Sequence, residues 1–81
     1  MIAVPRKMLD LRGVLCPINF VRTKLELEEL EAGELLEVTL DDGEPMRNVP
    51  RSVKAEGHRI VRVEKLGAGE AYRLLIQRAE E

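Results

Sequence analysis

The order in which strand and helix patterns follow one another most constrains the fold of this chain. Two stretches of helical periodicity, 17–31 and 46–57, are separated and flanked by short strand patterns. The strand patterns lie at 7–11, 34–40, 58–66 and 71–78. The order β-α-β-α-β-β predicts an α+β fold with a four-stranded mixed sheet. Because 81 residues leave room for one core, we expect a single domain over 1–81, a two-layer α/β sandwich with both helices on one face of the sheet.

The first helical pattern carries two apolar stripes on roughly opposite sides. Pro17 suits the first helical position, because its missing N–H costs nothing there, and Gly33 stops the pattern. The longer stripe consists of Phe20, Thr23, Leu27 and Leu30. The shorter stripe consists of Ile18, Val21 and Leu25. We expect the longer stripe to face the core and the shorter one to be partly exposed, although a rotation of the helix would bury both.

The second helical pattern is interrupted. Its apolar residues recur at i, i+3 and i+7, and Pro50 falls between the last two of them. Proline removes a helical hydrogen bond, so we expect the regular helix to start near Pro50. Asp41 and Asp42 precede the pattern. We interpret them as caps of the turn into this helix, where carboxylates suit the free N–H groups, rather than as a catalytic pair.

The single cysteine, Cys16, falls at the predicted N-cap of the first helix. There its sulfur would face the free N–H groups and the positive end of the helix dipole, which favour the thiolate. Arg12 and Arg22 are close in sequence and would add positive potential. One cysteine and one histidine, His58, predict neither an intramolecular disulfide nor a metal centre. A Cys–His dyad is disfavoured. The alternative to a reactive thiol is an inert, buried cysteine.

The composition disfavours direct binding of nucleic acid. The net charge is −2, the pI is about 5.5, and the aromatic residues are Phe20 and Tyr72. This chain therefore lacks the basic footprint and the stacking platforms of nucleic-acid binding proteins. It shows neither a signal-peptide pattern nor an apolar run of membrane-spanning length. These features predict a cytoplasmic protein whose thiol stays reduced.

The stretch from residue 9 to residue 65 resembles the TusA-type, or SirA-like, family of sulfur carriers. The matching pieces are "LDLRGVLCP", the "GE" after the first helix, "DD" after the second strand, and "RNVP" followed by "AEGH". The resemblance implies the β-α-β-α-β-β sandwich and makes Cys16 the carrier residue. It also implies a monomer without a cofactor, which acts as a cosubstrate rather than as a free-standing catalyst.

The resemblance further implies a route for the sulfur. Cys16 would accept sulfane sulfur as a persulfide from a cysteine desulfurase or a rhodanese-like donor. It would then hand the sulfur to a downstream acceptor protein, in tRNA thiolation, cofactor sulfuration or sulfur oxidation. Ile18, Val21 and Leu25 would form an apolar contact with such partners, and Arg12, Arg22 and Lys24 would steer acidic ones. The alternative is a non-catalytic regulatory or RNA-binding module on the same fold.

One residue departs from the family motif. The motif is Cys-Pro-x-Pro, and Asn19 stands where the second proline is expected. If Cys16 is the N-cap, Asn19 is the third helical residue, whose N–H is a usual partner of an N-cap side chain. We therefore hypothesise that the Asn19 N–H, which proline would lack, stabilises the Cys16 thiolate. Pro17 carries over as the residue that sets the helix start.

Overall fold

The computed structural model describes residues 4–79. Its elements follow the predicted order β-α-β-α-β-β, which is confirmed. They are β1 (Lys7–Asp10), α1 (Ile18–Glu29), β2 (Leu35–Asp41), α2 (Glu44–Ala55), β3 (Arg59–Leu66) and β4 (Ala71–Gln77).

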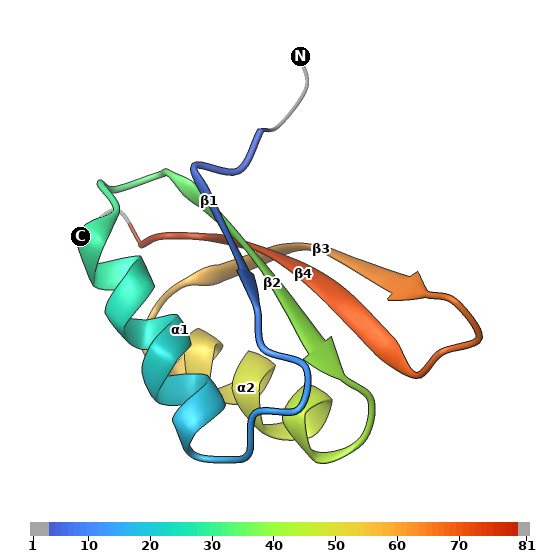
Figure 1. Cartoon of the computed structure of the whole chain (residues 1–81). Helices are drawn as coiled ribbons and strands as arrows, with labels where there is room; N and C mark the ends of the chain where they lie inside the picture. Colours follow the sequence, from blue (N-terminus) through green and yellow to red (C-terminus); the bar gives the residue numbers. More distant parts are fainter. Residues whose placement is uncertain (1–3, 80–81) are drawn as a thin grey trace.

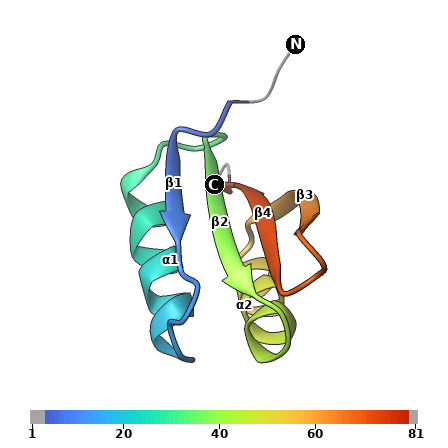
Figure 2. The ribbon, with the colours of Figure 1, turned by 45° about the vertical axis from the view of Figure 1, so that its right-hand side comes forward.

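The sheet has the strand order β1-β2-β4-β3 (Figure 1). β1 pairs with β2 in parallel, and the other two pairings are antiparallel, so the sheet is mixed as predicted. Both helices lie against one face of the sheet (Figure 2). The predicted two-layer architecture is therefore confirmed.

The core lies between the helices and the sheet. β2 alternates as the sequence predicts, with three fully buried residues: Leu36, Val38 and Leu40. From α1 the longer stripe faces them, with Thr23, Leu27 and Leu30 buried and Phe20 packed against the core. Each fully buried Leu or Val side chain contributes about 1.5–3 kcal/mol. This burial fixes the rotation of α1 and leaves its shorter stripe outside.

The other face of the sheet is charged. Arg73 on β4 lies between Glu37 on β2, at 3.5 Å, and Glu64 on β3, at 3.2 Å. These cross-strand pairs suit a face in contact with water. These charged side chains agree with a sheet that helices cover on one face only.

Two expectations about α2 are wrong. The helix starts at Glu44, after Gly43, and continues through Pro50 instead of starting near it. Pro50 removes one hydrogen bond, but the burial of Val49 and Val53 on either side holds the helix against the sheet. Gly43 is the N-cap, and it has a φ of +93°, which favours glycine.

Asp41 and Asp42 are not caps of α2, because no side chain caps this helix. The Asp41 carboxylate instead accepts a 2.6 Å hydrogen bond from the Gly13 N–H. This bond connects the end of β2 to the loop that follows β1. The sequence did not predict this long-range bond.

The end of the described chain is hydrogen-bonded to His58. The Ala79 N–H donates a 2.9 Å hydrogen bond to Nδ1 of His58, which requires this nitrogen to be unprotonated. Burial, followed by the nearby Arg78, lowers the pKa of His58 below its ordinary 6.5, while Glu56 opposes this shift. The folded chain therefore binds the histidine proton less readily than the unfolded chain does.

This histidine predicts a pH dependence of stability. Well above pH 6.5, His58 is neutral in both the folded and the unfolded chain. There its contribution to the free energy of unfolding is fully present. As the pH falls below the unfolded pKa, we expect the free energy of unfolding to decrease, until the folded pKa is also passed. Urea unfolding at several values between about pH 8 and pH 5 measures this slope. The variant His58→Gln should flatten it, and an equal slope in both proteins would contradict the assignment.

Candidate functional site

Cys16 lies in the loop of residues 11–17, between β1 and α1. The start of this loop is held to the sheet, because the Leu11 N–H donates to the Thr39 carbonyl at 2.9 Å and Leu11 itself is buried. Gly13, with a φ of +81°, turns the chain, and its N–H is the donor to Asp41. The loop is anchored at its base and exposed at its tip.

Cys16 is not the N-cap that the sequence predicted. The helix begins at Ile18 and Pro17 is the N-cap, so the cysteine stands one residue earlier. The Pro17 carbonyl accepts the first helical hydrogen bond, from the Val21 N–H at 3.0 Å. The chain enters the helix through a proline, whose side chain cannot accept a capping bond, and the peptide bond between Cys16 and Pro17 is cis.

The hypothesis about Asn19 is also wrong. Its N–H donates to the Leu15 carbonyl at 3.1 Å, so it is not free for the Cys16 sulfur. Its side chain is fully buried beneath the loop. There Oδ1 accepts from the Phe20 N–H at 2.7 Å and Nδ2 donates to the Val14 carbonyl at 3.4 Å. Asn19 therefore joins the loop to the first turn of α1.

The two arginines that lie close to Cys16 in the sequence, Arg12 and Arg22, do not interact with its thiol. The Arg12 guanidinium donates to Asp10 at 2.9 and 2.6 Å, which lowers the pKa of that carboxyl from 3.8 to about 2. Arg22 is exposed on α1. Within residues 4–79, no hydrogen bond or ion pair connects either arginine to Cys16. Lys24 pairs with Glu56 of α2 at 3.7 Å.

The side chain that does reach Cys16 comes from α2. Nδ2 of Asn48 lies 4.0 Å from the exposed Cys16 Sγ, at the long limit of an N–H···S contact. Sequence reasoning missed Asn48, and the available signal was its place in the "RNVP" stretch. Both helices begin at this end of the molecule (Figure 1), so the positive ends of both dipoles lie on the side of the thiol.

An apolar surface adjoins the thiol. The shorter stripe of α1 is exposed, as predicted, and Leu15 beside Cys16 extends it. We call these four residues, 43–79 % exposed, the apolar strip: Leu15, Ile18, Val21 and Leu25. Exposed apolar residues that cluster are typical of protein interaction sites.

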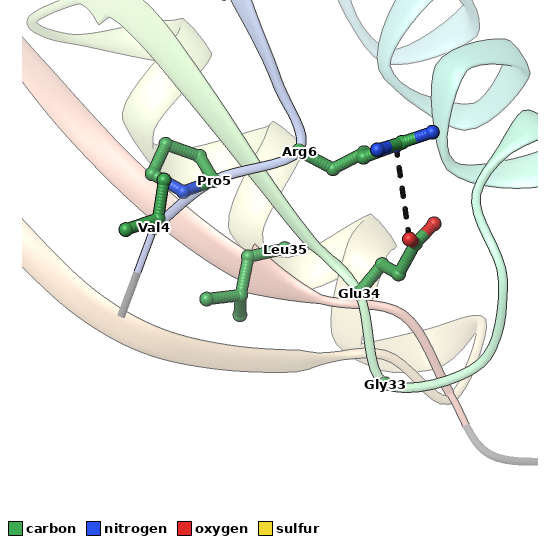
Figure 3. Close-up of a pocket in the computed structure, with 6 residues that line it drawn as sticks. All are labelled: Val4, Pro5, Arg6, Gly33, Glu34 and Leu35. Carbon is green, nitrogen blue, oxygen red and sulfur yellow. Dashed lines mark ion pairs between the residues drawn. The ribbon is translucent and has the colours of Figure 1, made fainter. Parts of the chain in front are cut away.

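The hollow in Figure 3 lies away from this site. It has a volume of about 370 Å³ and is found where β1 begins, whereas Cys16 follows the end of β1. Its wall includes the ion pair of Arg6 and Glu34, at 3.7 Å, and no cysteine, serine or histidine. Cys16 itself is exposed on a surface loop, so a second protein can reach its thiol directly.

No cluster of three or more His, Cys, Asp or Glu side chains that could bind a metal ion occurs within residues 4–79. Neither of the two helices in this range, each 12 residues long, is long and apolar enough to cross a membrane.

We expect Asp41→Ala to loosen the loop that carries the thiol. The substitution leaves the Gly13 N–H without its acceptor, which should cost about 1 kcal/mol of stability at this exposed position. Amide hydrogen exchange of residues 12–16 should accelerate, and that of β4 should follow only the small global change. Asp42→Ala is the matched control, because Asp42 is exposed and donates only through its backbone, to Glu70. Equal exchange in the two variants would contradict the role of Asp41.

Comparisons with known proteins agree on one family. The family model described as sulfurtransferase TusA matches residues 7–78. A protein of Archaeoglobus fulgidus named "Putative sulfur carrier protein" is 50% identical over 64 residues, 79% of this chain and 73% of that protein. One of Thermotoga maritima with the same name is 39% identical over 64 residues, 79% of this chain and 81% of that protein.

A solved structure supports the same assignment. The crystal structure of the SirA-like protein from Desulfitobacterium hafniense has a TM-score of 0.77 and 27% sequence identity. The match covers 91% of this chain and 99% of that one. Together with the family model, which spans nearly all of the described residues, these matches show that the chain belongs to the sulfurtransferase TusA family.

Proposed function

We propose that this protein is a sulfur carrier that holds sulfane sulfur as a persulfide on Cys16. The observation that carries the proposal is the exposure of a lone thiol at the tip of an anchored loop. A structural cysteine would be buried, whereas a carrier thiol must meet two other proteins in turn. The name of both relatives, "Putative sulfur carrier protein", points to the same role.

The first step is uptake from a donor protein, a cysteine desulfurase or a rhodanese-like enzyme. The Cys16 thiolate attacks the terminal sulfur of the persulfide on the donor cysteine. A new S–S bond forms on Cys16, the S–S bond of the donor breaks, and the donor cysteine leaves as a thiolate. The reaction exchanges one persulfide for another and needs no external oxidant or reductant.

The second step is delivery. A thiolate of the acceptor protein attacks the terminal sulfur on Cys16, and Cys16 leaves as a thiolate. This returns the carrier to its starting state, so it acts as a cosubstrate. tRNA thiolation, cofactor sulfuration and sulfur oxidation are the pathways that such a carrier can supply, and a reducing compartment such as the cytoplasm keeps the thiol free.

We assign recognition of these partners to the apolar strip. It adjoins Cys16 and is exposed, and the chemistry requires a partner's sulfur to come within bonding distance of Sγ. Contacts of this kind are small and transient, so a monomer can exchange partners rapidly. Arg22 on the same helix adds positive charge for acidic partners.

The substitution Val21→Asp tests this surface. It places a charge in the middle of the apolar strip, so we expect kcat/KM for sulfur transfer from a cysteine desulfurase to fall by about tenfold or more. Alkylation of Cys16 by iodoacetamide should be nearly unchanged, because that reagent needs no docking. Met8→Asp is the matched control, since Met8 is 68 % exposed on β1 and lies outside the strip. If both variants slow the transfer equally, the strip is not the docking surface.

A relay experiment tests the proposed function as a whole. The protein is loaded by a cysteine desulfurase with cysteine that carries radioactive sulfur, purified, and mixed with an acceptor protein that has a reactive thiol. We expect the label to move to the acceptor while Cys16 becomes free to alkylation. A label that never joins the protein, or one that never leaves it in the presence of competent acceptors, would contradict a carrier role.

A further inference from the structure

We propose that Asn48 is a catalytic residue of the reaction, whose amide N–H stabilises the anionic form of the Cys16 sulfur. This inference rests on the proposed function and names a residue of its machinery. Within residues 4–79, the Asn48 amide is the side-chain donor that lies within 4.0 Å of Sγ. The two residues are 32 positions apart in the sequence, so this contact is made by the packing of α2 beside α1.

The chemistry of the two steps gives such a donor a role. The Cys16 sulfur is a thiolate twice in each cycle, as the nucleophile in uptake and as the leaving group in delivery. A hydrogen bond to an ionised group is roughly twice as strong as one between neutral groups. The same N–H therefore favours the thiolate over the neutral thiol and over the neutral inner sulfur of a persulfide.

The position of Asn48 suits this role better than the residues first considered. The Asn19 N–H is committed to the Leu15 carbonyl, and Arg12 is committed to Asp10. Asn48 is half-buried in the second turn of α2, and its side chain makes no other hydrogen bond within the described residues. The contact is long in the resting state, as catalytic hydrogen bonds often are before the charge develops.

The alkylation rate of Cys16 measures this contact without any sulfur donor. We expect Asn48→Ala to react with iodoacetamide about three- to tenfold more slowly at neutral pH, because the thiolate loses a charge-assisted hydrogen bond. Asn48→Asp replaces the donor with a negative charge of the same shape and should slow the reaction further. In both variants the pH at which the rate is half-maximal should rise. Asn48→Gln keeps the amide and should recover part of the rate.

The matched control is Ser52→Asp. Ser52 lies four residues further along α2, a rise of about 6 Å, so an aspartate there adds the same charge without touching the contact. If Ser52→Asp and Asn48→Asp slow the alkylation equally, a general charge effect replaces our proposal. Wild-type rates and pH profiles in Asn48→Ala and Asn48→Asp would also overturn it. Equal urea midpoints across the set show that the comparison concerns folded proteins.

Delivery of sulfur provides the second readout. Loaded Asn48→Ala should transfer its sulfur to an acceptor thiol about three- to tenfold more slowly, because Cys16 becomes a poorer leaving group. Unchanged alkylation together with normal uptake and delivery would overturn the role of Asn48 alone. Failure of the wild-type protein to take up sulfur would overturn the carrier function, whatever the alkylation rates show.

Discussion

Replacing Cys16 with serine is expected to abolish all uptake of sulfane sulfur and to leave the fold unchanged. The serine hydroxyl stays neutral near pH 7 and is a far weaker nucleophile than a thiolate. The side chain is exposed, and among the described residues 4–79 its polar contact is the long one with Asn48. We therefore expect the free energy of unfolding to stay within about 0.5 kcal/mol of the wild-type value.

Two measurements on the same variant separate a reactive cysteine from a structural one. Urea unfolding gives the stability, and incubation with a cysteine desulfurase and cysteine gives the uptake. A loss of stability of about 2 kcal/mol or more would show that Cys16 packs into the structure. Uptake that persisted in the variant would show that the sulfur is held elsewhere.

The second large effect concerns Asn19. We expect Asn19→Ala to lower the free energy of unfolding by about 2–3 kcal/mol, because both partners of a fully buried amide lose their hydrogen bonds. The Phe20 N–H would lose its acceptor and the Val14 carbonyl its donor, and neither is freely accessible to water. The space left by the amide adds to the cost.

The control for this substitution is Arg22→Ala, one turn away on the exposed side of α1. It should change the stability by less than about 0.5 kcal/mol. Urea unfolding of both variants measures the two free energies of unfolding. A stability of Asn19→Ala equal to that of Arg22→Ala would contradict the role of Asn19 in joining the loop to the helix.

The fold follows from patterns that act over short stretches of sequence. The alternation of Leu36, Val38 and Leu40 defines the buried face of β2, and the two stripes of α1 define which side packs on it. These patterns express the burial of apolar area, which is the largest stabilising term and is local in sequence. The order of elements and the exposure of Ile18, Val21 and Leu25 were predictable for this reason.

The site follows from contacts that no short stretch contains. Asp41 reaches Gly13 across 28 positions and Asn48 reaches Cys16 across 32, so both depend on how the elements pack. Closeness in sequence suggested Arg12 and Asn19 as partners of the thiol, but their donors are satisfied locally, by Asp10 and by Leu15. Capping rules placed Cys16 one residue too close to the helix, because they did not anticipate Pro17 as the N-cap.

The central claim is that Cys16 carries sulfane sulfur, and the mass of the intact protein tests it most directly. After incubation with a cysteine desulfurase and cysteine, the account predicts a gain of one sulfur atom, about 32 Da. Fragmentation should locate the gain on the peptide that contains Cys16, and dithiothreitol should remove it. An unchanged mass with a donor that loads other carriers, or a gain that survives in Cys16→Ser, would contradict the account.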